Sequence, residues 1–157
     1  MRALCAVALA AMVSAPLGAR ARADGRAIAL VVHPDSPVRD LSLGELRNIF
    51  LGQKKQWSGG DPIVPIYLVP TSEVSAAFAQ KALGKSLEDL EKYWIDERIR
   101  GGAKKPRTVP TAATARKLVG SLPSAVAYIP LAEVDGSVRV VAIDGVAPSS
   151  GSYRLRY

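Results

Sequence analysis

The stretch Leu41–Trp57 reads LSLGELRNIFLGQKKQW and contains a helix start, an apolar stripe and a helix stop within seventeen residues. Ser42 and Glu45 stand three positions apart just before apolar residues, which is the spacing of a capping box. Gly52 follows the last apolar residue, where a left-handed conformation ends helices at least cost. The pattern predicts a short amphipathic helix that packs on a sheet through one apolar face. That face is formed by Leu43, Leu46, Ile49 and Phe50.

Segments on either side alternate between strand-like and helix-like patterns. Continuous runs of apolar, largely β-branched residues predict buried strands, whereas Ser or Thr ahead of apolar residues at helical spacing predicts helix starts. Gly84 is placed to end the second helix. The expected strands are Ala27–His33, Ile63–Val69, Ala125–Ile129 and Ser137–Ile143, and the further helices begin at Thr71 or Ser72, at Ser86 with Asp89, and at Thr111.

Strands that alternate with helices of about ten residues favour crossover connections on a largely parallel sheet. We therefore expect an α/β fold: a single domain with a mostly parallel (mixed) sheet and helices on both faces. Pro65 cannot donate to a ladder, so it implies an irregular or edge pairing at that position. The last six residues, SYRLRY, are a candidate for an additional edge strand.

Residues 1–23 have the pattern of a secretory signal, and residues 24–157 form the expected domain. Arg2 precedes a short apolar run, and Ala21-Arg22-Ala23 fits a cleavage site with small residues. The apolar run is too short for a stable membrane span. Removal of three arginines with the signal lowers the formal charge from +7 to +4. The single cysteine, Cys5, lies within the signal, so no disulfide is expected in an exported, periplasmic or secreted protein.

The letters of three segments resemble a known family. The run L-S-x-x-E-L-x-x-I-F-x-G-x-x-x-x-W, then G-x-P-I-x-P-I, and finally PSAVAYIP at 123–130 are similar to the second lobe of the phosphate-binding proteins that serve bacterial ABC importers. The resemblance implies one lobe of a type II periplasmic binding protein. The family's first lobe has no counterpart ahead of Ile28, so we expect a short, single-lobe member.

The turn at Pro70–Ser75 is the position with the clearest physical reason to hold a ligand. It joins the carboxyl end of a strand to a helix start, where unpaired N–H groups favour anions. The resemblance implies a phosphate contact sequence R-x-x-x-S-G-T here, of which this chain keeps only the serine, Ser72. Leu68, Glu73 and Val74 stand at the arginine, glycine and threonine positions. The candidate ligand-binding residues are Thr71, Ser72 and Ser75; the plain alternative for Thr71 or Ser72 is a helix cap.

Other chemistry has little support in the sequence. His33 is the only histidine and has no cysteine or carboxylate pair at metal-ligand spacing. The basic segment Arg98–Arg107 is expected to be a solvated loop that could instead contact an acidic partner. We find no nucleophile elbow, phosphate-cradling glycine loop or zinc spacing, so an enzyme is not expected. We expect no catalytic residue, metal or cofactor, and neither nucleic-acid binding nor stable membrane insertion.

Two functions follow from these observations. The first is an anion-binding module that holds phosphate or another small anion weakly, or senses one, at Thr71–Ser75. The second is a periplasmic accessory module with no small ligand, which associates with a protein partner or with a second copy of itself. A lobe without its covering lobe exposes a surface of the kind that commonly marks association sites.

Overall fold

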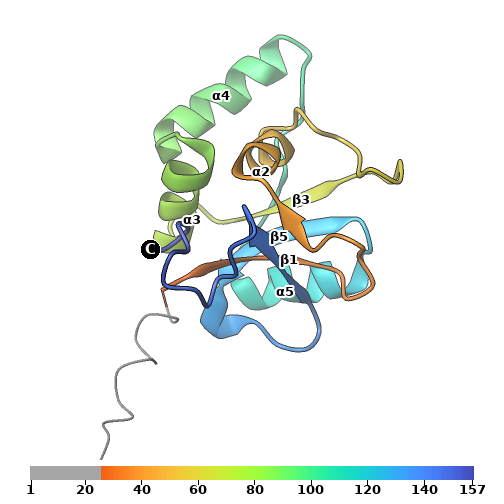
Figure 1. The fold of residues 1–157 in the computed structure, drawn as a ribbon. Helices are drawn as coiled ribbons and strands as arrows, with labels where there is room; N and C mark the ends of the chain where they lie inside the picture. Colours follow the sequence, from red (N-terminus) through yellow and green to blue (C-terminus); the bar gives the residue numbers. More distant parts are fainter. Residues whose placement is uncertain (1–25) are drawn as a thin grey trace, which may run out of the picture.

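Six strands form one mixed sheet in the computed structural model, which describes residues 26–157. The expected signal at 1–23 lies outside the described residues. The strand order across the sheet is β2-β6-β1-β5-β3-β4, and Figure 1 labels the neighbouring strands β1, β5 and β3. The strands span Ile28–Val32 (β1), Asp40–Leu41 (β2), Val64–Leu68 (β3), Arg107–Val109 (β4), Ala125–Pro130 (β5) and Arg139–Ile143 (β6).

All strands except β1 run in the same direction. β3 pairs in parallel with both β4 and β5, and β2 pairs in parallel with β6. The central strand β1 is antiparallel to both of its neighbours, β5 and β6. All five residues of β1 are buried, as expected for a strand that is covered on both faces. The predicted mostly parallel, mixed α/β sheet is confirmed.

Helices cover both faces of this sheet (Figure 1). Helix α5 packs against β5, β1 and β3, while α3 contacts β3 and β5 from the other face. A π-helical turn, η1, continues α3 and ends at Gly84, whose φ of 67° gives the predicted left-handed stop. The helices are Leu43–Phe50 (α2), Glu73–Phe78 (α3), Ala79–Leu83 (η1), Leu87–Ile99 (α4), Ala112–Ser121 (α5) and the 3-10 turn Leu131–Glu133 (η2).

Four aromatic rings form the centre of the core on the face covered by α2 and α3. Phe78 stacks on Tyr128 with ring centroids 3.8 Å apart and the planes 9° from parallel. Phe50 meets Phe78 edge-on at 4.9 Å and Tyr67 edge-on at 5.5 Å. These rings come from two helices and two neighbouring strands, so their burial fixes α2 and α3 on the sheet.

Local signals in the sequence predicted the helix ends well. Ser42 and Glu45 form the complete capping box, and Gly52 lies just after α2 with a φ of 71°. Ser72, Ser86 and Thr111 cap α3, α4 and α5.

One strand detail agrees with the sequence analysis and one differs. Pro65 pairs with β5 alone, because the pairing of β3 with β4 begins at Ile66, so it occupies an edge position as predicted and its missing N–H breaks no ladder bond. The end of the chain makes a single bridge, Ala27 to Arg156, rather than an edge strand. Tyr153 and Leu155 of this segment are buried, and the Tyr153 hydroxyl donates to the Ile28 carbonyl at 2.9 Å.

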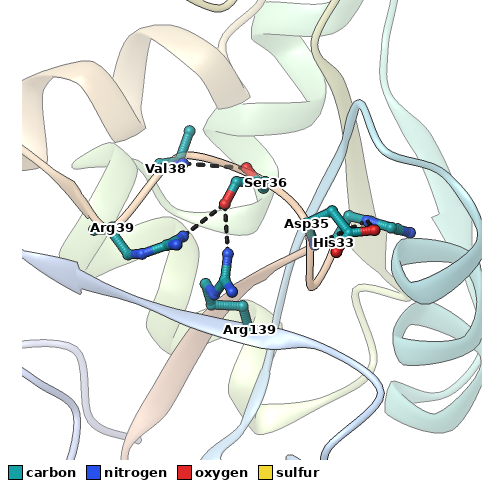
Figure 2. Close-up of polar contacts among 6 residues, drawn as sticks. All are labelled: His33, Asp35, Ser36, Val38, Arg39 and Arg139. Atoms are coloured by element: carbon teal, nitrogen blue, oxygen red, sulfur yellow. Dashed lines mark hydrogen bonds and ion pairs between the residues drawn. The ribbon is translucent and has the colours of Figure 1, made fainter.

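Two arginines hold the loop between β1 and β2. Arg39 and Arg139 each donate a hydrogen bond of 2.6 Å to the carbonyl oxygen of Ser36 (Figure 2). On the same loop, the Asp35 backbone N–H donates to Nδ1 of His33 at 3.2 Å. Because Arg139 lies at the start of β6, its bond ties the loop to the strand beside β1. His33 accepts the hydrogen bond from the Asp35 backbone N–H within this loop, and that contact gives the imidazole a structural role.

Candidate functional site

The predicted ligand-binding turn lies where β3 ends and α3 begins. β3 ends at Leu68, and Ser72 caps α3 by accepting a hydrogen bond from the Ser75 backbone N–H at 3.1 Å. Thr71 is exposed, and no side-chain hydrogen bond joins it to another described residue. Of the three predicted residues, the structure therefore brings Ser72 and Ser75 into contact and leaves Thr71 at the surface.

Ser75 is inside the protein, with only 2% of its surface exposed. Its hydroxyl lies 2.9 Å from the Val69 carbonyl and 2.8 Å from the Ser72 hydroxyl. The Tyr128 hydroxyl, which comes from the neighbouring strand β5, lies 3.2 Å away. These contacts join α3 to the ends of β3 and β5, so the Ser75 hydroxyl is used by the fold.

Tyr128 completes this buried network. Its hydroxyl accepts a hydrogen bond of 3.2 Å from the Leu68 backbone N–H. Burial raises the pKa of Tyr128, although the bonds to Ser75 and Leu68 act in the opposite direction. The phenol is therefore neutral at ordinary pH and serves as a hydrogen-bonding group between two strands.

A small cavity of about 50 Å³ lies beside these hydroxyls. This volume is well below the range of small-molecule binding sites, about 300–1,000 Å³. Lys105 is the cation in its lining, and its ammonium group is paired with Glu91 at 2.5 Å. Trp94 also lines the cavity, and its indole N–H is buried without a hydrogen-bond partner.

The entrance to α3 has little positive charge to offer an anion. Leu68, at the position where the resemblance implies an arginine, is a buried apolar residue of the core. Glu73 is exposed in the first turn of α3, where its carboxylate opposes an incoming anion. The geometry leaves the N–H groups of the helix start and the exposed Thr71 hydroxyl as available donors.

Sequence reasoning missed Tyr128, Trp94 and Lys105 as neighbours of the turn. Tyr128 belongs to the quoted PSAVAYIP segment, but its contact with Ser75 spans 53 positions in the chain. Only the pairing of β3 with β5 places the two side by side.

Residues 26–157 contain neither a metal-binding cluster nor a membrane-spanning helix. No group of three His, Cys, Asp or Glu side chains in that range is placed to hold a metal ion. None of the helices in that range combines the length and apolar character that a bilayer crossing requires.

Known proteins with similar sequences and folds are phosphate-binding proteins. The chain is 29% identical to the phosphate-binding protein PstS of Bacillus subtilis (strain 168), over 78% of this chain and 38% of that protein. A phosphate ABC transporter substrate-binding protein from Clostridium perfringens, solved with bound phosphate, has a TM-score of 0.66 and 26% identity, over 78% of this chain and 47% of that one.

An ABC-type phosphate transport receptor from Vibrio cholerae has a TM-score of 0.65 at 21% identity, over 78% of this chain and 48% of that one, which supports the fold alone. No protein-family model matches the chain. The chain spans less than half the length of the relatives it matches here. In sequence and in fold the chain is similar to the phosphate ABC-transporter substrate-binding proteins, and it has part of the type II periplasmic binding protein fold.

Proposed function

We propose that this chain is an exported, non-enzymatic solute-binding-like domain that holds phosphate or another small anion weakly at the Thr71–Ser75 turn, through the Thr71 hydroxyl and the backbone N–H groups at the start of α3. The main observation in support of the proposal is the geometry of the turn between β3 and α3. It keeps the position and the N–H groups of an anion-binding helix start, while its serine hydroxyls bond within the protein and an exposed carboxylate stands beside them. Its relatives are named for phosphate binding, and export to the periplasm or the medium fits the signal pattern at 1–23.

Weak binding follows from the missing charge. A hydrogen bond to a charged group is worth about 1.5–3 kcal/mol, and about 1.4 kcal/mol changes affinity tenfold. A turn that lacks an arginine contact therefore loses one to two decades of phosphate affinity at that contact alone. We expect dissociation constants of about 1 mM or weaker for phosphate and sulfate, corresponding to about −4 kcal/mol.

Isothermal titration of the purified chain with phosphate, sulfate and acetate tests this proposal. Glu73→Gln removes the carboxylate at the start of α3 and is expected to tighten phosphate binding about two- to fivefold, the size of an exposed charge interaction. Glu88→Gln makes the same change in the first turn of α4 and should leave binding unchanged. A micromolar phosphate affinity, or equal effects of the two variants, would contradict weak binding at this turn.

The second candidate is an accessory module that binds a protein partner or a second copy of itself. The observation in its favour is on α4, which extends along one side of the molecule (Figure 1). Ile99, its last residue, is 76% exposed and stands one helical turn from Ile95, which is 41% exposed, so α4 presents two large apolar side chains on one exposed face. Sedimentation velocity over a range of concentrations should then show self-association that Ile99→Ser weakens. A monomer at all concentrations, with no crosslinked partner in the periplasmic fraction, would rule out this candidate.

A further inference from the structure

A groove of about 470 Å³ lies between α4 and the loop that follows it. This volume falls within the range of small-molecule binding sites, about 300–1,000 Å³. Trp94 and Ile95 of α4 and Ala103 of the loop supply apolar surface. Trp94 is 4% exposed and held in the core, so this part of the wall is fixed, whereas Ile95 is 41% exposed. The remaining lining residues are Glu91, Arg98, Gly101, Gly102, Lys104 and Lys105.

The groove carries two positive side chains that have no partner in the described chain. Neither Arg98 nor Lys104 forms a side-chain hydrogen bond or ion pair with any residue of 26–157. Lys105, by contrast, is neutralised by Glu91. The guanidinium of Arg98 and the ammonium of Lys104 are thus left to interact with solvent or with a ligand.

The acidic groups nearby are engaged elsewhere. Asp96 lies 4.0 Å from the Arg100 guanidinium, and the Glu97 carboxylate accepts a hydrogen bond of 2.9 Å from the Ala103 backbone N–H. The carbonyls at the end of α4 accept from the backbone N–H groups of Arg100, Gly101 and Gly102. The groove therefore combines apolar walls with uncompensated positive charge at its edge.

We propose that this groove binds a small organic anion with an apolar body, such as an aromatic carboxylate. The carboxylate would take charge-assisted hydrogen bonds from Arg98 and Lys104, and the ring would pack against the apolar surface of Trp94 and Ile95. Inorganic phosphate could use the charges but not the apolar surface. The site is thus different in place and in ligand chemistry from the anion-binding turn at α3.

The test uses 2-naphthoate as the probe on the full chain, with the neutral 2-naphthalenemethanol and acetate as partial ligands. Binding is followed by calorimetry and by the NMR signal of the Trp94 indole N–H, which Trp57→Phe distinguishes from the second tryptophan. We expect 2-naphthoate to bind at least about tenfold more tightly than either partial ligand, because only it uses both the charge and the apolar surface. Saturation should shift the Trp94 signal.

Matched variants separate this groove from general attraction to a basic protein. Arg98→Gln with Lys104→Gln should weaken 2-naphthoate binding about tenfold or more, the loss of charge-assisted bonds. Lys117→Gln with Arg154→Gln removes the same charge from exposed positions elsewhere and should leave affinity within about twofold. Ile95→Ser should weaken binding, while Ile99→Ser should not, and circular dichroism checks the fold of each.

The proposal is overturned if the two double variants lose affinity equally, if 2-naphthalenemethanol binds as well as 2-naphthoate, or if the Trp94 signal stays unmoved at saturation. The same holds if 2-naphthoate does not bind. None of these results bears on phosphate binding at the α3 turn. That binding is tested separately, by titrating the Glu73→Gln variant with phosphate.

Discussion

The Ser75 hydroxyl is a single polar group that must serve several neighbours inside the protein. It has one proton, and the Val69 carbonyl at 2.9 Å is nearer than the Leu68 carbonyl at 3.3 Å. We therefore assign its proton to Val69 and its lone pairs to the hydroxyls of Ser72 and Tyr128. Tyr128 then donates to Ser75 and accepts from the Leu68 N–H, so its own bonds are consistent with this assignment.

Ser75→Ala should destabilise the fold by about 1–3 kcal/mol, because it leaves the buried Tyr128 and Val69 groups without this partner. Tyr128→Phe should lower the free energy of unfolding less in the Ser75→Ala variant than in the parent chain. In that variant the Tyr128 hydroxyl has already lost its Ser75 partner, so removing it costs less. Urea unfolding of the four chains measures this coupling. Ser121→Ala, which removes an exposed hydroxyl, is the control and should change stability by less than about 0.5 kcal/mol. Strictly additive costs would contradict the assigned network.

The role of Ser75 shows where sequence reasoning about the site stopped. Its place after Ser72 in a strand-to-helix turn was readable, and so was the capping function of Ser72. The burial of Ser75 was not, because it depends on Tyr128 reaching across from β5. A hydroxyl with the spacing of a ligand residue and one that bonds two strands look identical in a linear sequence.

Among the elements, the end of α2 is fixed by contact with the loop after α4. Gly52 has a φ of 71°, and a methyl group on its Cα would lie 2.6 Å from the Cβ of Ala103. Trp94 would be the next neighbour, 3.6 Å away. Two requirements therefore exclude a side chain at Gly52: its backbone conformation and the close approach of the loop.

Gly52→Ala should cost about 2–4 kcal/mol, the sum of the left-handed penalty and the overlap. Ala103→Gly in the same chain removes the overlap alone and should recover about half of that cost. Gly44→Ala is the matched control in the same helix, where the nearest atom is 3.9 Å away and φ is not positive. It should stabilise the protein by about 0.5–1 kcal/mol. Thermal unfolding of the variants gives the values, and similar signs for Gly44→Ala and Gly52→Ala would contradict this account.

Elements that rest on local chemistry were the ones predicted from sequence. The capping box of Ser42 and Glu45 and the stop at Gly52 need only neighbours in the chain. Strands β2 and β4 were missed because they have two and three residues, too few for a periodic pattern. Such short strands form because a longer neighbouring strand, β6 for β2 and β3 for β4, supplies their backbone hydrogen-bond partners.

At the scale of the whole molecule, the sequence predicts which segments form the inner strands of the sheet but not the direction in which each strand runs. Buried apolar runs indicated inner strands for β1, β3 and β5. The same pattern fits a strand of either direction, so the antiparallel placement of β1 between β5 and β6 could not be read from the sequence. That placement matters because it brings the chain end, Tyr153–Tyr157, back to the start of β1.

Buried tyrosines make the whole fold sensitive to alkali. Tyr67, Tyr128 and Tyr153 come from β3, β5 and the chain end, and burial is the first cause that raises the pKa of each. The hydroxyls of Tyr67 and Tyr153 donate to the carbonyls of Phe50 and Ile28 at 2.8 and 2.9 Å. An ionised phenolate would lose these bonds and leave a charge inside the core.

Stability should therefore be lost as pH rises above the ordinary tyrosine pKa of about 10. A raised pKa in the folded state means that the unfolded chain releases its phenolic protons first, so this stability is fully present below pH 10. Each such tyrosine adds a downward slope of up to about 1.4 kcal/mol per pH unit above that value. Tyr153→Phe should lower the slope by one such increment. Absorbance at 295 nm and circular dichroism should then change together for the buried phenols, because these groups ionise as the chain unfolds. Complete tyrosine ionisation ahead of any loss of dichroism would show that the phenols reach solvent in the folded protein.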